Sequence, residues 1–218
     1  LLESRGLGDV YKRQRIYDRL AGVPPSNAVL SQMETVISTN GSDPLCLTAG
    51  ATGATCAAYI AMNDVSFYNV TLKNFAAPWT NRDMNAFVPL NDYIAMVIGM
   101  VRDDIPFNTL LSADIAYVGS GVAAPSASNN DHYSQLESSN TNLRDNLTQT
   151  TQSSINGLPP GDVAGAMTTR AAAEAFFIAG TNRAMFRFTL LNHLCNDKEQ
   201  MHDPKLTTDR IRQDVSRS

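Results

Sequence analysis

The sequence has few cysteines, few charged residues and no long apolar run, and each shortage excludes a class of protein. Three cysteines in 218 residues are too few for a disulfide-rich scaffold. Charged residues make up only 17%, and the net charge of -4 argues against a disordered polyelectrolyte and a basic nucleic-acid-binding protein. No segment approaches the roughly 18 consecutive apolar residues of a membrane-spanning helix. With 43% hydrophobic residues, the chain can form one large or two small globular domains with a hydrophobic core.

Neither end of the sequence resembles the natural terminus of a complete protein. Residues 1–14 (LLESRGLGDVYKRQ) lack the apolar segment and the small-residue cleavage site of a secretory signal. Their GLGDVYKRQ string resembles the translated sequencing-adapter tails that contaminate environmental assemblies, so we expect an artefactual or disordered tail; a flexible polar terminus is the alternative. Residues 210–218 look helical and stop without a glycine or proline terminator. We therefore expect a fragment that is truncated at both ends.

Helical spacing of apolar residues dominates the pattern, and two-residue alternation is nearly absent. The strongest helix is predicted from Pro89 to Asp103, and we expect it at the centre of the core. Its apolar positions are Leu90, Tyr93, Ile94, Val97, Ile98 and Val101. Ser26 is a candidate N-cap for a second helix that ends at residues 40–44, and residues 57–62 and 67–75 suggest two more helical pieces. A short helix is expected from Pro106 to Asp114. The fold class is predicted to be mainly α, an irregular multi-helix bundle.

A polar tract suggests that the helices form two lobes. Residues 119–131 and 134–157 are rich in Ser, Asn, Thr and Gln, with few apolar anchors. We expect an N-terminal helical lobe over 15–118, a polar linker over 119–161 and a truncated C-terminal helical lobe over 162–218. In that last lobe, Thr168 or Thr169 can cap a helix ending at Gly180. Thr181 can cap the next helix, through Cys195, and a last one is expected near Thr207.

Cys46 and Cys56 lie ten residues apart on either side of a small-residue run. This spacing permits a disulfide in an oxidising compartment, and two buried free thiols fit the sequence equally well. The intervening GATGAT run at 50–55 has the glycines of a phosphate-binding loop. Because no Lys-Ser or Lys-Thr pair follows and no strand precedes it, the run favours close packing between helices.

The only local cluster of metal-capable side chains comprises His193, Cys195, His202 and Asp203. His193 and Cys195 are two residues apart, which on a helix turns their side chains about 200° away from each other. A packing cysteine and exposed histidines are therefore the preferred interpretation. His132 stands alone in a polar segment and indicates no catalytic triad.

A ligand-binding cleft is a further hypothesis, formed by Trp79, Arg82, Asp103 and Asp104. A tryptophan in a polar loop can bind a sugar or cofactor, and paired carboxylates can transfer protons. The competing interpretations are a tryptophan that plugs the core and a solvated helix end. In the second case Arg82 or Arg102 would offset the unfavourable carboxylates at the helix C-terminus.

Four segments together resemble a known family. Residues 181–195 (TNRAMFRFTLLNHLC) and 207–217 (TTDRIRQDVSR) are similar to the domain of unknown function that precedes a haem-binding CysXaaXaaCysHis motif in planctomycete-type cytochrome-associated proteins. Residues 165–168 (GAMT) look like the opening of that domain, and 102–115 (RDDIPFNTLLSADI) resemble a segment of its companion N-terminal domain. The family's proline-rich tract is replaced here by residues 196–204, and the CysXaaXaaCysHis motif itself is absent from these 218 residues.

The resemblance implies an exported bacterial protein, periplasmic or extracellular. It implies that these residues form a helical scaffold or docking region for electron transfer, whose partner is a haem-bearing domain of the same chain beyond Ser218. No cofactor is expected in the fragment itself, whereas haem c is expected in the full-length protein. The alternative function is an extracellular polymer-binding or degradative module that uses the cleft around Trp79, Arg82, Asp103 and Asp104.

Overall fold

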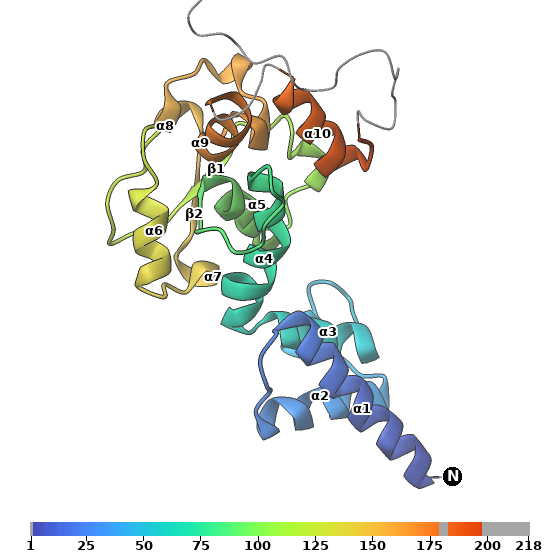
Figure 1. Cartoon of the computed structure of the whole chain (residues 1–218). Helices are drawn as coiled ribbons and strands as arrows, with labels where there is room; N and C mark the ends of the chain where they lie inside the picture. Colours follow the sequence, from blue (N-terminus) through green and yellow to red (C-terminus); the bar gives the residue numbers. More distant parts are fainter. Residues whose placement is uncertain (1, 179–182, 198–218) are drawn as a thin grey trace, which may run out of the picture. The chain divides into compact units, whose positions relative to one another are not determined.

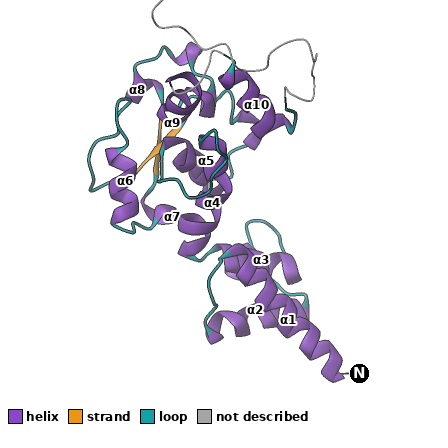
Figure 2. Cartoon of the chain, viewed as in Figure 1, coloured by secondary structure: helices purple, strands orange, loops and turns teal. Residues whose placement is uncertain are grey.

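The computed structural model describes residues 2–178 and 183–197, and all statements about structure below refer to these residues. They are mainly helical, as the sequence predicts, and they also contain one two-stranded antiparallel sheet, which the sequence analysis does not predict (Figures 1 and 2). The chain divides into two compact units: unit 1, Leu1–Leu72, and unit 2, Lys73–Ser218. None of the described helices combines the length and the apolar character that crossing a membrane requires.

Unit 1 is built on three helices that pack on one another. Its elements are α1 (Leu2–Leu20), α2 (Asn27–Thr39), the 3-10 turn η1 (Pro44–Cys46), α3 (Gly53–Met62) and the π-helical segment η2 (Phe67–Leu72). Its core gathers buried residues from all three helices, among them Tyr17, Met33 and Ile60. Ser26 caps α2 as predicted, since its side chain accepts a hydrogen bond from the backbone N–H of Val29.

Residues 2–14 belong to α1, so the expected disordered tail is helical. The segment contains no proline, and it runs directly into Tyr17 and Ala21, which are buried in the core of unit 1. Arg13 also bonds to α2, through the carbonyl of Leu30 and the carboxylate of Glu34. The adapter origin of these residues stays a prediction.

Unit 2 surrounds α5 (Asp92–Arg102), which is capped by the side chain of Asn91 and lies in the middle of the unit (Figure 1). Every residue from Tyr93 to Met100 is buried, so the predicted central helix is confirmed. The other elements of unit 2 are α4 (Lys73–Ala76), η3 (Ala77–Thr80), η4 (Phe107–Thr109), β1 (Ala116–Val118), α6 (Asp131–Ser138), α7 (Leu143–Asn146), β2 (Thr148–Thr150), α8 (Ser153–Asn156), η5 (Pro160–Asp162), η6 (Gly165–Thr168), α9 (Arg170–Ala172), η7 (Ala173–Ile178) and α10 (Ala184–Leu194).

The polar tract at 119–157 is part of unit 2, and the division between the units falls at Leu72 and Lys73 instead. β1 pairs with β2 in antiparallel register, with Tyr117 opposite Gln149. The tract has few apolar anchors, but Leu136, Leu143 and Leu147 are each at most 3% exposed. A small number of fully buried side chains therefore folds the tract onto α5, where a linker was expected.

Two other expectations for unit 2 are corrected or refined. The helix expected from Pro106 to Asp114 is reduced to the single turn η4. Thr169 caps the α9–η7 helix, as one of the two predicted caps, by accepting the backbone N–H of Ala172. Gly180, Thr181 and the helix expected near Thr207 lie outside the described residues.

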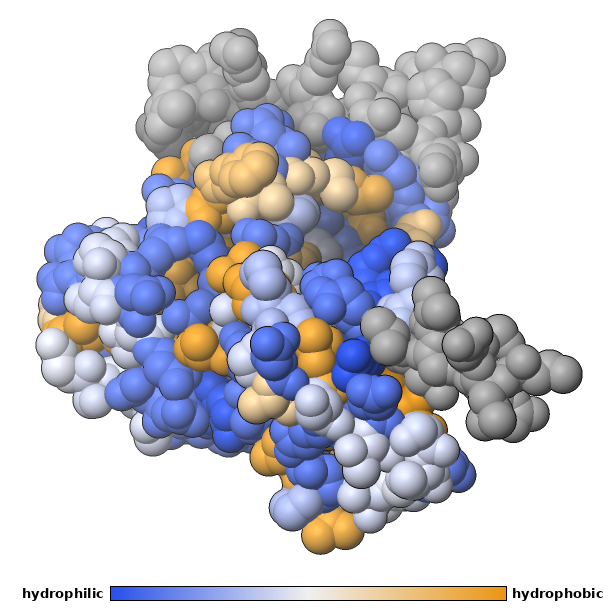
Figure 3. Space-filling model, turned by 90° about the horizontal axis from the view of Figure 1, so that it is seen from below, coloured by the Kyte–Doolittle hydropathy of each residue, from blue (hydrophilic) through white to orange (hydrophobic). Residues whose placement is uncertain are grey.

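The exposed apolar side chains of the described residues do not form one continuous patch on the face drawn in Figure 3. On the face drawn in Figure 3 they lie in separate groups between hydrophilic residues. Scattered apolar exposure of this kind is ordinary for a folded protein.

Candidate functional site

Cys46 and Cys56 form a disulfide, with an S–S distance of 2.07 Å, and so one of the two alternatives for this pair is confirmed. The bond joins η1 to the first turns of α3, and both residues are fully buried. Between them, Gly53 packs so closely on Asn40 that an added Cβ would lie 2.5 Å from the Asn40 side-chain oxygen. The small-residue run thus serves close packing, as its sequence favours.

Asp103, one of the predicted cleft residues, ends α5 and is held by two neighbours. Arg102 binds both of its carboxylate oxygens, at 2.6 and 2.9 Å, and the Tyr117 hydroxyl donates to it at 2.8 Å. The hydrogen bonds from Arg102 lower the pKa of this carboxyl, and the bond from Tyr117 adds to the effect. Arg102 also donates to the carbonyls of Arg144 and Leu147. Arg102 thus offsets the unfavourable carboxylate at the C-terminus of α5. Of the two arginines considered for this role, Arg82 and Arg102, the contacts identify Arg102.

The other three cleft residues have different surroundings. Asp104 is exposed and adopts a left-handed backbone conformation, with φ 53°. Arg82 is exposed in the segment after η3. Trp79 is half-buried in η3, among aromatic rings. The pocket described below is lined by none of these four residues.

Trp79 is the middle of an aromatic group that we call the Trp79 cluster, defined by Phe75, Trp79, Phe107 and His193. The ring centroids of Phe75, His193 and Phe107 lie 4.8, 5.7 and 6.4 Å from that of Trp79. The side chain of Asn192 donates to the Trp79 carbonyl, which ties α10 to η3. Phe75 and Phe107 remain 56% and 43% exposed. The cluster is therefore an aromatic surface, with two open rings beside a half-buried indole.

His193 joins this surface to the core of unit 2. Its Nε2 lies 2.7 Å from the hydroxyl of Tyr93, the first buried residue of α5. Burial raises the pKa of Tyr93 and lowers the pKa of His193, so burial favours the neutral form of both side chains in this contact. His193 is half-buried, which corrects the expectation of an exposed histidine.

The predicted metal-capable cluster is only partly described. Cys195 is an exposed free thiol in the left-handed residue that caps α10, whereas His202 and Asp203 lie outside the described residues. Within the described part of the chain, no three His, Cys, Asp or Glu side chains are grouped to hold a metal ion.

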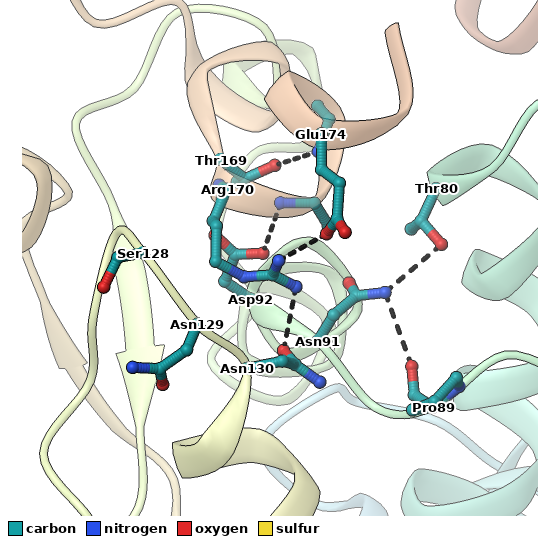
Figure 4. A network of polar contacts seen from close by, with 12 residues as sticks. Thr80, Pro89, Asn91, Asp92, Ser128, Asn129, Asn130, Thr169, Arg170 and Glu174 are labelled. Atoms are coloured by element: carbon teal, nitrogen blue, oxygen red, sulfur yellow. Dashed lines mark hydrogen bonds and ion pairs between the residues drawn. The ribbon is translucent and has the colours of Figure 1, made fainter. Parts of the chain in front are cut away.

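A pocket of about 250 Å³ lies in unit 2, and sequence analysis missed it. Apolar side chains line most of it, and its polar end contains Asp92 and Arg170 (Figure 4). Asp92 accepts hydrogen bonds from the backbone N–H groups of Arg170 and Ala171, at the start of α9. Burial raises the pKa of this carboxyl, although these bonds and the nearby Arg170 charge act in the opposite direction.

The Arg170 guanidinium continues this network. It donates to Glu174, one turn further along the helix, and to the side chain of Asn130 (Figure 4). A signal for Asp92 exists in the sequence, because Asn91 and Asp92 form a polar pair at the start of the most apolar helix. Nothing in the sequence indicates that Arg170, 78 residues away, meets it.

Comparison with protein-family models, with curated proteins and with solved structures finds no match for this chain.

Proposed function

We propose that unit 2 is a docking module of an exported electron-transfer protein, and that the Trp79 cluster receives a haem-bearing c-type domain of the same protein. The observation that carries the proposal is the exposed aromatic surface around Trp79, with Phe75 and Phe107 more than two-fifths open. Aromatic side chains grouped around a tryptophan are typical of the energetic centre of a protein interface. The apolar edge of a haem is a suitable partner for such rings.

The position of the cluster along the chain supports this occupant. His193 is directly followed by Leu194 and Cys195, the pair that the family resemblance places before the haem cysteines. α10 ends at Leu194. A haem domain that follows in the sequence would therefore be tethered near this surface, at a high effective concentration.

Export is supported by the disulfide. Cys46–Cys56 is the kind of bond that persists in the periplasm or outside the cell, and is rare in the reducing cytosol. Because these two cysteines are joined to each other, they cannot form the two thioether bonds of a haem c. The haem is therefore assigned to the partner domain, and this chain supplies the surface.

The first test is to read the coding sequence that surrounds these 218 residues and to express the longer protein with c-type haem maturation. The expected result is a CysXaaXaaCysHis motif within a few dozen residues of Ser218, and the absorption spectrum of a covalently bound haem. A continuation without the motif would refute the proposal.

The second test addresses the surface, by measuring the affinity of the separately produced haem domain for the 218-residue chain. Trp79→Ala and Phe107→Ser are expected to weaken binding about tenfold or more. Phe87→Ser is the matched control, because Phe87 is 91% exposed and outside the cluster. Equal effects of all three substitutions would contradict docking at the Trp79 cluster. Circular dichroism of each variant checks that its fold is retained.

A further inference from the structure

We propose that the pocket of unit 2 binds a small, uncharged and mainly apolar molecule that carries a carbonyl group. This site is separate from the Trp79 cluster, since no residue of the cluster lines the pocket. The proposal therefore does not depend on haem docking.

The walls of the pocket determine the size and polarity of the ligand. Apolar side chains come from β1 and the residue before it, from the loop before α6, from α8 and the residues after it, and from η7. They are Ile115, Ala116, Pro125, Ala127, Ile155, Leu158 and Ala173. A cavity of about 150 Å³ lined by apolar side chains is large enough for benzene. At about 250 Å³, this pocket has room for a bicyclic molecule.

The loop over the pocket is held in place by His132, which is buried. The imidazole Nε2 accepts the backbone N–H of Gly119 at 3.1 Å, so the proton is on Nδ1, which donates to the Ala123 carbonyl at 2.5 Å. Pro125 and Ala127, which follow these anchor points, line the pocket. The wall is thus fixed before a ligand binds, which reduces the entropy lost on binding.

The polar groups around the pocket argue for a neutral ligand. The side-chain nitrogen of Gln152 donates to the carbonyls of Ile115 and Gly165, and its oxygen accepts from Thr168. The charge of Arg170 is shared with Glu174 and lies close to Asp92. A charged ligand would lose its hydration on entering the pocket. The charged side chains there already have partners, so they would not offset this cost in free energy.

One donor defines the polar atom of the ligand. Among the residues that the structure describes, the Nε–H of Arg170 is buried and has no hydrogen-bond acceptor, and Arg170 lines the pocket. A buried donor without an acceptor costs free energy, which an acceptor atom of a ligand would recover. A neutral carbonyl oxygen would supply that acceptor without a charge, once the Arg170 side chain turns its Nε–H toward the pocket.

The test compares two probes that have the same bicyclic frame, indane and its ketone 1-indanone, by NMR titration of the isotope-labelled 218-residue chain. We expect 1-indanone to shift the amide signals of Ile155, Thr168 and Ala173 saturably. Indane is expected to bind more weakly, by about fivefold or by a larger factor. Absence of saturable shifts up to the solubility limit of both probes, or shifts confined to other residues, would overturn the site. Equal affinities would overturn the carbonyl assignment.

Substitutions in the wall separate this pocket from non-specific binding. Ala173→Leu fills the pocket and is expected to weaken 1-indanone binding about tenfold. Ala164→Leu is the matched control, at an exposed alanine that does not line the pocket, and its effect should stay within about twofold. Leu158→Gln is a second variant at a wall residue that is 37% exposed, chosen because its substitution is better tolerated by the fold. Unchanged affinity in a folded wall variant would refute the assignment.

Discussion

At the scale of single residues, charges in unit 2 serve mainly to tie segments together. Arg102 connects the end of α5 with the carbonyls of Arg144 and Leu147, while it binds the Asp103 carboxylate. Asp92 fastens the start of α9 to the start of α5. Paired carboxylates in a sequence suggest acid–base chemistry, but here Asp103 already has two partners and Asp104 is exposed. The contacts of Asp103 stabilise the helix end, and an acid–base role of the pair stays a prediction.

The lowered pKa of Asp103 makes its contribution to stability depend on pH. Its bonds favour the ionised carboxylate, so the contribution is complete above the ordinary Asp pKa of about 3.9 and is lost as the pH falls through the lowered folded value. Asp103→Asn should reduce the free energy of unfolding at pH 7 by about 1 kcal/mol, because the pair lies at the surface and its side chains are still 18% and 30% exposed to solvent, which screens it. Urea denaturation of both proteins at pH 7 and pH 2 checks this. The difference should be smaller at the lower pH, and a constant difference would show that ionisation plays no part.

At the scale of elements, α5 approaches β1 through a glycine. A Cβ added to Gly99 would lie 2.2 Å from the ring of Tyr117, which is fully buried beside it. Helix propensity alone favours alanine over glycine by about 1 kcal/mol. The clash involves a packed ring that cannot move away, and its cost should exceed this gain.

Gly99→Ala is therefore expected to lower the free energy of unfolding by about 1–3 kcal/mol, measured by urea denaturation. Gly161→Ala is the control, because an added Cβ there meets no atom within 4 Å. A Gly99→Ala protein that is more stable than the native one would show that propensity outweighs packing at this crossing.

The disulfide is the cross-link between η1 and α3. It closes a short loop, with ten residues of separation, and loops of this size contribute about 2–3 kcal/mol. Replacing both Cys46 and Cys56 by Ala should lower the stability of unit 1 by that amount, as measured by thermal denaturation under oxidising conditions. Cys195→Ser is the control, since Cys195 is exposed and unbonded. If both variants melted alike, the cross-link would have no stabilising role.

Elements with a strong local pattern could be predicted from the sequence, whereas long-range partners could not. The apolar spacing within α5 and the serine just before α2 are both local signals, and each predicts its feature correctly. β2 is a three-residue polar strand that pairs with β1, about 30 residues earlier in the sequence. The same limit applies to the sites. Cys46 and Cys56 lie only ten residues apart, so the sequence indicates them as a possible pair, whereas Trp79 meets His193 across more than a hundred residues.

At the scale of the whole molecule, the residues that the structure describes form two cores, one in each unit, and their division differs from the lobes that the polar tract suggests. The core of unit 1 draws on residues from Tyr17 to Ala61, including the disulfide. The core of unit 2 is built around α5, and residues of the polar tract such as Leu136 complete it. Composition reports how polar a segment is on average, while folding depends on the few side chains that become buried.

Two cores predict two responses to a single charge. Ile94→Asp places an unpaired carboxylate in the fully buried helix α5, at a cost of several kcal/mol, which is comparable to the stability of a small domain. We expect it to unfold unit 2 and to leave α2 and α3 of unit 1 folded around their disulfide. Amide hydrogen exchange followed by NMR distinguishes the two, because protection should disappear in α5 and persist at Met33 and Ile60. Ile37→Asp, at a half-buried position of α2, should give the reverse pattern. Simultaneous loss of protection in both units would mean that they fold as one cooperative structure.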